Sequence, residues 1–247
     1  MFKNNKILLS FIASLALTGT NAFAENTEDP SDVASAVTSF TASLNNGGDV
    51  KGQITYSFNV NESQQGMVAL EGTMNDHGKY KDSRLQYFHV FDLGNPVAPK
   101  VAASLDMVDN DLMSTAAVGA VVAITPVERF AMYIRVGALT GQYSDEVTQQ
   151  FNVADNSANG VMAAGYFTVK TGNDGTYFMV APEYTYVDGD VETSALKTTI
   201  RLGTPLNDKK THWGELRLEN NVNTLETASK TIDTDDTVAW FNFKAYF

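Results

Sequence analysis

The chain has 247 residues and a formal net charge of −12 at pH 7, from 29 acidic residues and 17 lysines and arginines. This balance argues against nucleic acid as a partner, because binding to phosphate backbones depends on clustered cations. Cysteine is absent, which excludes disulfides, thiolate metal sites and a lipid anchor on an N-terminal cysteine.

Residues 1–24 have the pattern of a secretory signal peptide. A basic start with Lys3 and Lys6 precedes the apolar run Ile7–Leu17, and Ala22-Phe23-Ala24 is a small-x-small cleavage site. We expect cleavage after Ala24, which leaves 25–247 as a single domain with a net charge of −14. An uncleaved anchor helix is the alternative. After residue 24, no stretch approaches the ~20 apolar residues that a spanning helix needs.

Apolar and polar residues alternate with a period of two along the rest of the chain. The clearest run is 50–60, where one face carries Val50, Ile54, Tyr56, Phe58 and Val60 and the other carries Lys51, Gln53, Thr55, Ser57 and Asn59. This alternation indicates β-strands with one apolar face. The run is close to the ~9–11 residues of a tilted strand that crosses a membrane.

The pattern predicts twelve strands and an all-β fold. They are 33–42, 49–60, 66–75, 84–93, 100–108, 115–124, 129–141, 159–170, 176–187, 193–203, 211–222 and 237–247. The first has no clean polarity, so a ten-stranded barrel with this hairpin outside it is the alternative. Pro182 lies inside a strand and cannot donate to a ladder, so we expect a bulge there.

The connections fall into two groups if the two chain ends lie on the same side of the sheet. One group is short and rich in Gly, Pro, Asn and Asp, as tight turns require. The other includes the two longest connections, 142–158 and 223–236. These carry the acidic residues Asp145, Glu146, Asp155, Glu226, Asp233, Asp235 and Asp236.

Charged residues fall on one face of the predicted strands, opposite the apolar face. They are Lys51, Glu71, Arg84, Asp92, Lys100, Asp106, Arg135, Glu183, Lys197, Arg201, Glu215, Arg217, Glu219 and Lys244. A charge that faces lipid at the midplane costs roughly 2–4 kcal/mol, so this separation suits a barrel with charges inside. The candidate lumen-lining residues are Lys51, Glu71, Arg84, Asp106, Arg135, Glu183, Lys197, Arg201, Glu215, Arg217 and Glu219.

The chain ends on a strand, with Phe243, Ala245 and Phe247 on its apolar face. A terminal amphipathic strand that ends in Phe resembles the C-terminal signature of Gram-negative outer-membrane β-barrels. The resemblance implies a closed antiparallel transmembrane β-barrel in the cell outer membrane. It also implies that barrel-assembly machinery reads Phe243, Ala245 and Phe247, and that membrane lipid and lipopolysaccharide are the surrounding partners.

Catalytic and metal-binding motifs are not found. His77, His89 and His212 belong to no nucleophile constellation, and His89 and His212 fall on the outward register. The acidic sequences 109–111 and 188–190 are ordinary turn sequences without the ligand count of a calcium loop. We therefore expect no enzyme activity, no metal site and no cofactor.

Eight cations and six anions on the inner face allow two interpretations. They could line a narrow porin-like channel for small polar or charged solutes, which is the leading prediction. They could instead pair across a closed lumen, in a structural or adhesive barrel that acts through its acidic loops. Twelve strands do not decide between these. An outer-membrane enzyme and a soluble periplasmic β-protein are further alternatives, and the solute and oligomeric state stay open.

Overall fold

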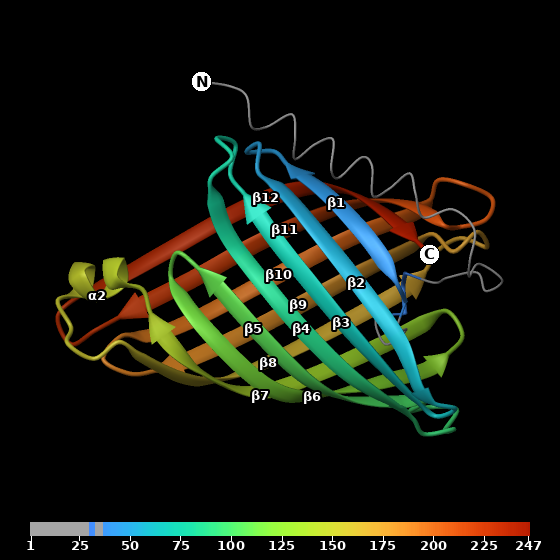
Figure 1. Cartoon of the computed structure of the whole chain (residues 1–247), viewed down its shortest axis with the longest axis horizontal. Coiled ribbons are helices and arrows are strands. Elements are labelled where there is room, and N and C mark those ends of the chain that lie inside the picture. The colour runs from blue at the N-terminus through green and yellow to red at the C-terminus, as the bar shows by residue number, and fades with distance from the viewer. Residues whose placement is uncertain (1–29, 33–36) are drawn as a thin grey trace.

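The computed structural model describes residues 30–32 and 37–247, and these form a closed antiparallel barrel of twelve strands (Figure 1). Each strand pairs with its sequence neighbours, and β1 pairs with β12 to close the ring. The predicted fold class and the strand number of twelve are confirmed. The expected signal peptide lies outside the described residues. None of the described helices has the length and hydropathy to cross a membrane.

The strands follow the predicted alternation. Their bounds are β1 Ser39–Asn45, β2 Val50–Asn61, β3 Gln64–Met74, β4 Tyr80–Asp92, β5 Lys100–Asn110, β6 Met113–Val127, β7 Phe130–Tyr143, β8 Ser157–Lys170, β9 Tyr177–Asp188, β10 Glu192–Pro205, β11 His212–Glu226 and β12 Thr231–Tyr246. Among the described residues there is one short helix, α2, which spans Asp145–Phe151 between β7 and β8. The residues described before Ser39 are not in a strand, so β1 begins later than predicted.

The prediction of a long loop over 223–236 is wrong. Strands β11 and β12 continue through most of this stretch, and residues 227–230 alone connect them. Polar side chains pair across the two strands: Thr224 Oγ1 donates to Asp233 Oδ1 over 2.7 Å, and Asn223 Nδ2 donates to Thr234 Oγ1 over 3.2 Å. The ladder extends past the apolar part of the barrel because these cross-strand pairs replace apolar ones.

Pro182 lies in the middle of β9 and produces no bulge, so this expectation is also wrong. The pairing between β8 and β9 passes from Ala164–Glu183 to Phe167–Val180 with an unchanged register. Gly165 of β8 lies opposite the proline in this register. The missing N–H therefore opens a local gap in one ladder, while Pro182 remains in register with Thr198 of β10 on its other side.

The barrel has two distinct ends, which we call the α2 end and the terminal end. The α2 end carries the connections 46–49, 75–79, 111–112, 144–156, 189–191 and 227–230. The terminal end carries the C-terminus and the connections 62–63, 93–99, 128–129, 171–176 and 206–211. Figure 1 shows the C-terminus and α2 at opposite ends of the barrel.

The outer surface of the barrel is an apolar belt. Large apolar side chains such as Val118, Leu70 and Leu216 are 57–63% exposed. Among the described residues, outward-facing charges on the strands occur only at the α2 end, and they are Asp109, Asp188, Glu192, Glu226, Asp233 and Asp235. This exposed apolar surface is far larger than a soluble monomer carries, as expected for a barrel that faces lipid.

One ion pair fastens the β1–β2 turn to the start of β4. Lys81 Nζ lies 2.7 Å from Asp49 Oδ2, and Asn45 Nδ2 donates to the same oxygen over 3.0 Å. The hydrogen bond from Lys81 holds the pKa of Asp49 below its ordinary value, against the opposing effect of burial. The carboxylate is therefore ionised at neutral pH and holds the turn at the α2 end.

Substitution of Ile134 tests the belt directly. Ile134 faces outward in the middle of β7, so Ile134→Arg should cost about 2–4 kcal/mol and reduce the folded fraction in lipid vesicles. Thr140→Arg, outward on the same strand near the α2 end, is the control and should fold normally. Heat-modifiable gel migration measures the folded fraction. Equal folding of both variants would contradict the assigned belt.

Candidate functional site

A cavity of about 260 Å³ lies inside the barrel and is lined by inward-facing side chains. Nine of the eleven candidate lumen-lining residues border it: Lys51, Glu71, Arg84, Arg135, Lys197, Arg201, Glu215, Arg217 and Glu219. Lys100 and Lys244, also predicted on the inner face, line it as well. The other two candidates, Asp106 and Glu183, contact cations of this lining. Asp92 is exposed at the end of β4, in register with Lys100.

Asp106 of β5 holds two arginines in place, Arg84 on the neighbouring β4 and Arg135 on β7. Arg84 makes a two-pronged contact with the carboxylate, with its Nε 2.8 Å from Oδ1. Arg135 Nη2 lies 2.9 Å from Asp106 Oδ2, and its guanidinium lies 5.7 Å from the centre of the Phe88 ring. The Asp106 side chain is only 3% exposed. One buried carboxylate thus orients two guanidiniums in the wall of the cavity.

Glu215 is a second buried carboxylate with several partners. Asn242 Nδ2 donates to Oε1 over 2.6 Å, and Lys244 Nζ lies 2.8 Å from Oε2. The hydroxyl of Tyr177 donates to the same Oε2. The Tyr177 ring packs directly on Gly203. A Cβ at position 203 would lie 2.3 Å from Cε1 of the ring. The glycine therefore gives the tyrosine access to Glu215, and the satisfied carboxylate fixes Lys244 at the cavity.

Arg201 and Arg217 face each other in the β10–β11 register and are less fully paired. Arg217 Nε lies 3.5 Å from Glu219 Oε1, and its guanidinium lies 5.0 Å from the Trp240 ring. Arg217 Nη2 and Arg201 Nε are buried and make no hydrogen bond to any described residue. Two adjacent guanidiniums thus retain donor capacity in the wall of the cavity.

Two further ion pairs lie in the wall of the cavity. Lys51 Nζ lies 2.7 Å from Glu71 Oε1, and Lys197 Nζ lies 3.4 Å from Glu183 Oε1. Eight cationic and three anionic side chains line the cavity, and Asp106, Glu183 and Asp32, which contact lining cations, bring the anions to six. The charge around the cavity is therefore net positive although the chain as a whole is acidic.

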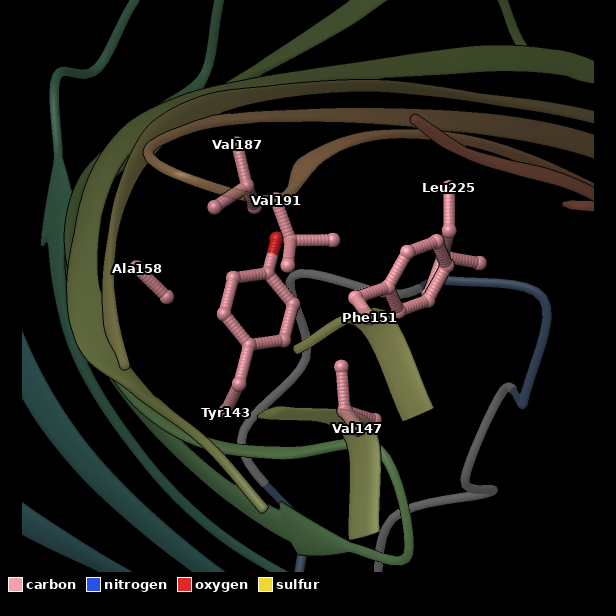
Figure 2. Close-up of a cluster of buried hydrophobic side chains, with 7 residues drawn as sticks. All are labelled: Tyr143, Val147, Phe151, Ala158, Val187, Val191 and Leu225. Carbon is pink, nitrogen blue, oxygen red and sulfur yellow. The ribbon is translucent and has the colours of Figure 1, made fainter. Parts of the chain in front are cut away.

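An apolar cluster fills the interior near the α2 end. It consists of Tyr143, Val147, Phe151, Ala158, Val187, Val191 and Leu225, all buried. Figure 2 shows these side chains gathered inside the curve of the barrel wall, with Val147 and Phe151 contributed by α2. The sequence predicted a charged inner face and did not predict this apolar part of the interior. The four-residue spacing of Val147 and Phe151 within the 142–158 connection was the available signal for a packed helix.

Local sequence explains the helix. Ser144 is its N-cap and accepts from Val147 N over 3.4 Å, and Asp145 and Glu146 in the first turn complement the helix dipole. The helix ends at Asn152, which adopts the left-handed conformation at φ 54°. Lys230 of the β11–β12 turn lies 5.2 Å from the Phe151 ring. The helix thereby links two hairpins across the α2 end.

Residues 30–32 lie against the interior at the terminal end. Tyr133, which faces inward and is 1% exposed, donates from its hydroxyl to Asp32 Oδ1 over 2.8 Å. Lys100 Nζ lies 3.5 Å from Asp32 Oδ2. Ser31 is buried and borders a second cavity of about 420 Å³ beside the β6–β7 turn. The segment thus occupies part of the interior there.

The proposed assembly residues lie at the seam of the barrel. Phe243 and Ala245 are on the outward register of β12, and Ala245 is in register with Phe40 of β1 and His212 of β11. The N–H of Phe247 donates to Thr38 O over 3.1 Å. The last residues of the chain therefore take part in the pairing that closes the ring.

The histidines lie outside the cavity. His77 is in an exposed turn with its Nδ1 2.6 Å from Asp76 Oδ1, and His89 and His212 are on the outward registers of β4 and β11. Within residues 30–32 and 37–247, no group of three or more His, Asp or Glu is placed to hold a metal ion.

The fold is shared with solved outer-membrane channels. The NanC porin matches with a TM-score of 0.61 and 8% identity over 85% of this chain and 99% of its own. The KdgM porin matches with a TM-score of 0.50 and 9% identity over 85% and 98%. The COG4313 outer membrane channel from Pseudomonas putida F1 matches with a TM-score of 0.52 and 10% identity over 85% and 94%. No family model and no curated protein matches the sequence.

The packing of α2 can be tested by removing its apolar anchors. Val147→Ser with Phe151→Ser should detach the helix, because loss of a buried Phe alone costs about 3–5 kcal/mol. Amide hydrogen exchange should rise over residues 144–156 and stay slow in the β-ladders. Gln149→Ser, exposed on the same helix, is the control. Unchanged exchange in the double variant would show that the cluster does not hold α2.

Proposed function

We propose that this protein is an integral outer-membrane β-barrel that forms a narrow channel for small polar or charged solutes. The observation that carries the proposal is the charged cavity inside a closed barrel with an apolar outer belt. Charged side chains around a lumen select ions and polar solutes by their field. The shared fold of the NanC, KdgM and COG4313 structures supports this reading.

The location and orientation belong to the same proposal. After cleavage near Ala24, the terminal end faces the periplasm and the α2 end faces the cell exterior. The outward charges at the α2 end then stand beyond the lipid, where divalent cations can bridge them to lipopolysaccharide. Barrel-assembly machinery reads Phe243, Ala245 and Phe247 on the closing strand.

Three features support a narrow channel rather than a wide pore. The central cavity measures about 260 Å³, which is small for a ligand site. The apolar cluster around α2 fills part of the interior toward one end, and residues 31 and 32 occupy part of it toward the other. A solute must therefore be small and must pass close to the charged wall.

The charge balance supports a preference for anions. Eight cations line the cavity against three anions, and the two buried carboxylates, Asp106 and Glu215, are already engaged by cations. Arg201 and Arg217 line the cavity, and neither makes a hydrogen bond to a carboxylate of the described residues, so their charges are the least compensated ones that a passing anion meets. A positive field in a low-dielectric wall raises the local concentration of anions.

A structural barrel with a closed lumen is the second candidate. Ion pairs such as Lys51–Glu71 and Lys244–Glu215, together with the α2 cluster, favour it because they fill and neutralise the interior. In that case the acidic α2 end would be the functional surface. A barrel that inserts but never conducts would support this candidate.

Planar-bilayer recording separates the two candidates. Purified protein in a KCl gradient should give small single-channel steps and a reversal potential of the sign for chloride preference. Arg201→Gln with Arg217→Gln should reduce that preference at least about twofold, since two of the eight lining cations are lost. Lys209→Gln, in an exposed turn, is the control and should match the parent protein. Insertion without conductance would overturn the channel proposal.

Deletion of Phe247 tests the assembly signal. The truncated protein should reach the outer membrane at a severalfold lower level, because it loses the terminal side chain and the Phe247–Thr38 hydrogen bond at the seam. Cell fractionation measures the level. Phe247→Tyr keeps an aromatic ring and is the control. Equal levels of all three proteins would contradict the assembly role.

A further inference from the structure

We propose that the cavity binds small amphiphilic organic anions, which combine one carboxylate with a compact apolar body. The inference rests on the proposed channel function and deepens it by naming the class of solute. It follows from the unequal walls of the cavity: one carries cations without a close carboxylate partner for each, and the other carries the apolar side chains of the lining.

The cationic wall is formed by β10, β11 and β12. Arg201 and Arg217 lie in register on β10 and β11, and Lys244 is held at the cavity by Glu215. Arg217 is 10% exposed, and its Nη2 is unpartnered among the described residues, as is Nε of Arg201. A carboxylate is the natural partner for such paired guanidinium donors, because it can accept two parallel hydrogen bonds.

The apolar side chains of the lining come from β4, β5 and β6, where they lie beside Arg84, Gln86 and Lys100. Phe88 and Val90 of β4, Ala102 of β5 and Val121 and Ala123 of β6 line the same cavity and face inward. In β5 and β6, Ala102 is in register with Val121, so the apolar side chains are contiguous across the ladder.

Closure of the barrel places the two walls opposite each other. In a ring of twelve strands, β5 lies six strands from β11 in either direction. A solute in the cavity therefore meets the cations of β10, β11 and β12 on one side, and on the other side the methyl groups and phenyl ring that β4, β5 and β6 contribute beside Arg84 and Lys100. The cations on the second side are already engaged by carboxylates, because Arg84 and Arg135 both bind Asp106 and Lys100 Nζ lies 3.5 Å from Asp32 Oδ2.

This arrangement discriminates between classes of anion. A polyhydroxylated anion would bring hydroxyls against the apolar wall, where their lost hydrogen bonds to water are not replaced. A compact apolar body gains from the same contact. An apolar cation would meet the excess of positive charge, and so only the combination of anion and apolar body satisfies both walls.

Block of the KCl current in planar bilayers tests the proposal, with three probes on the full-length mature protein. Benzoate carries both features, gluconate has the charge without the apolar body, and benzylammonium has the apolar body with the opposite charge. The half-blocking concentration of benzoate should be about tenfold lower than that of either other probe.

Two variants assign the effect to the apolar wall. Val121→Thr keeps the shape and places a hydroxyl in the wall, and it should raise the half-blocking concentration of benzoate at least about threefold, with gluconate unchanged. Val108→Thr is the matched control, because Val108 also faces inward on β5 but does not line the cavity. Block is measured against each variant's own KCl current.

The outcomes separate this inference from the channel proposal. Absence of any KCl current would overturn the channel itself. A KCl current that benzoate blocks no better than gluconate or benzylammonium would overturn the inference and leave the channel standing. Equal benzoate block of the parent, Val121→Thr and Val108→Thr proteins would also overturn it, because the apolar wall would then play no part.

Discussion

Closure of the sheet is the constraint on which the rest of this structure depends. In hydrocarbon, an unpaired backbone N–H or C=O costs several kcal/mol, and only a sheet without edges satisfies every strand. Here the seven residues of β1 pair with β12 and supply that closure. Once the ring is closed, successive side chains along each strand point alternately outward to the apolar belt and inward to the lumen.

The separation of charge follows from this geometry. Outward positions between the two ends carry apolar side chains, and inward positions carry lysine, arginine and glutamate. Buried charge is costly unless it is paired and hydrogen-bonded, and Asp106 and Glu215 meet this condition with two arginines and with a lysine, an amide and a tyrosine, respectively. Both carboxylates are therefore engaged by cations, and the surface of the cavity is net positive.

The interior also contains two apolar clusters beside the charged residues. The apolar cluster at the α2 end lies on one side of these residues, and Tyr177, Met179, Ala181 and Trp213 form a second apolar cluster. These clusters exclude water from parts of the interior and leave the charged groups around a central cavity. The free space inside the barrel is thus defined by packing as much as by charge.

Twelve strands, their faces and the absence of charge from the outer face between the two ends of the barrel were predictable from the sequence, because a period of two reports directly which residues share a face of a strand. Pro182 and the 223–236 stretch were misread. A ladder tolerates one missing donor without a change of register, and polar cross-strand pairs sustain β11 and β12 where their outward face is no longer apolar.

The apolar interior around α2 and the opposition of the two cavity walls were decided by the tertiary structure alone. Residues such as Val121 and Arg217 are far apart in the chain, and no local pattern relates them. They meet across one cavity because the closed ring sets β6 and β11 on opposing sides of it, a relation that exists only after the first and last strands have paired.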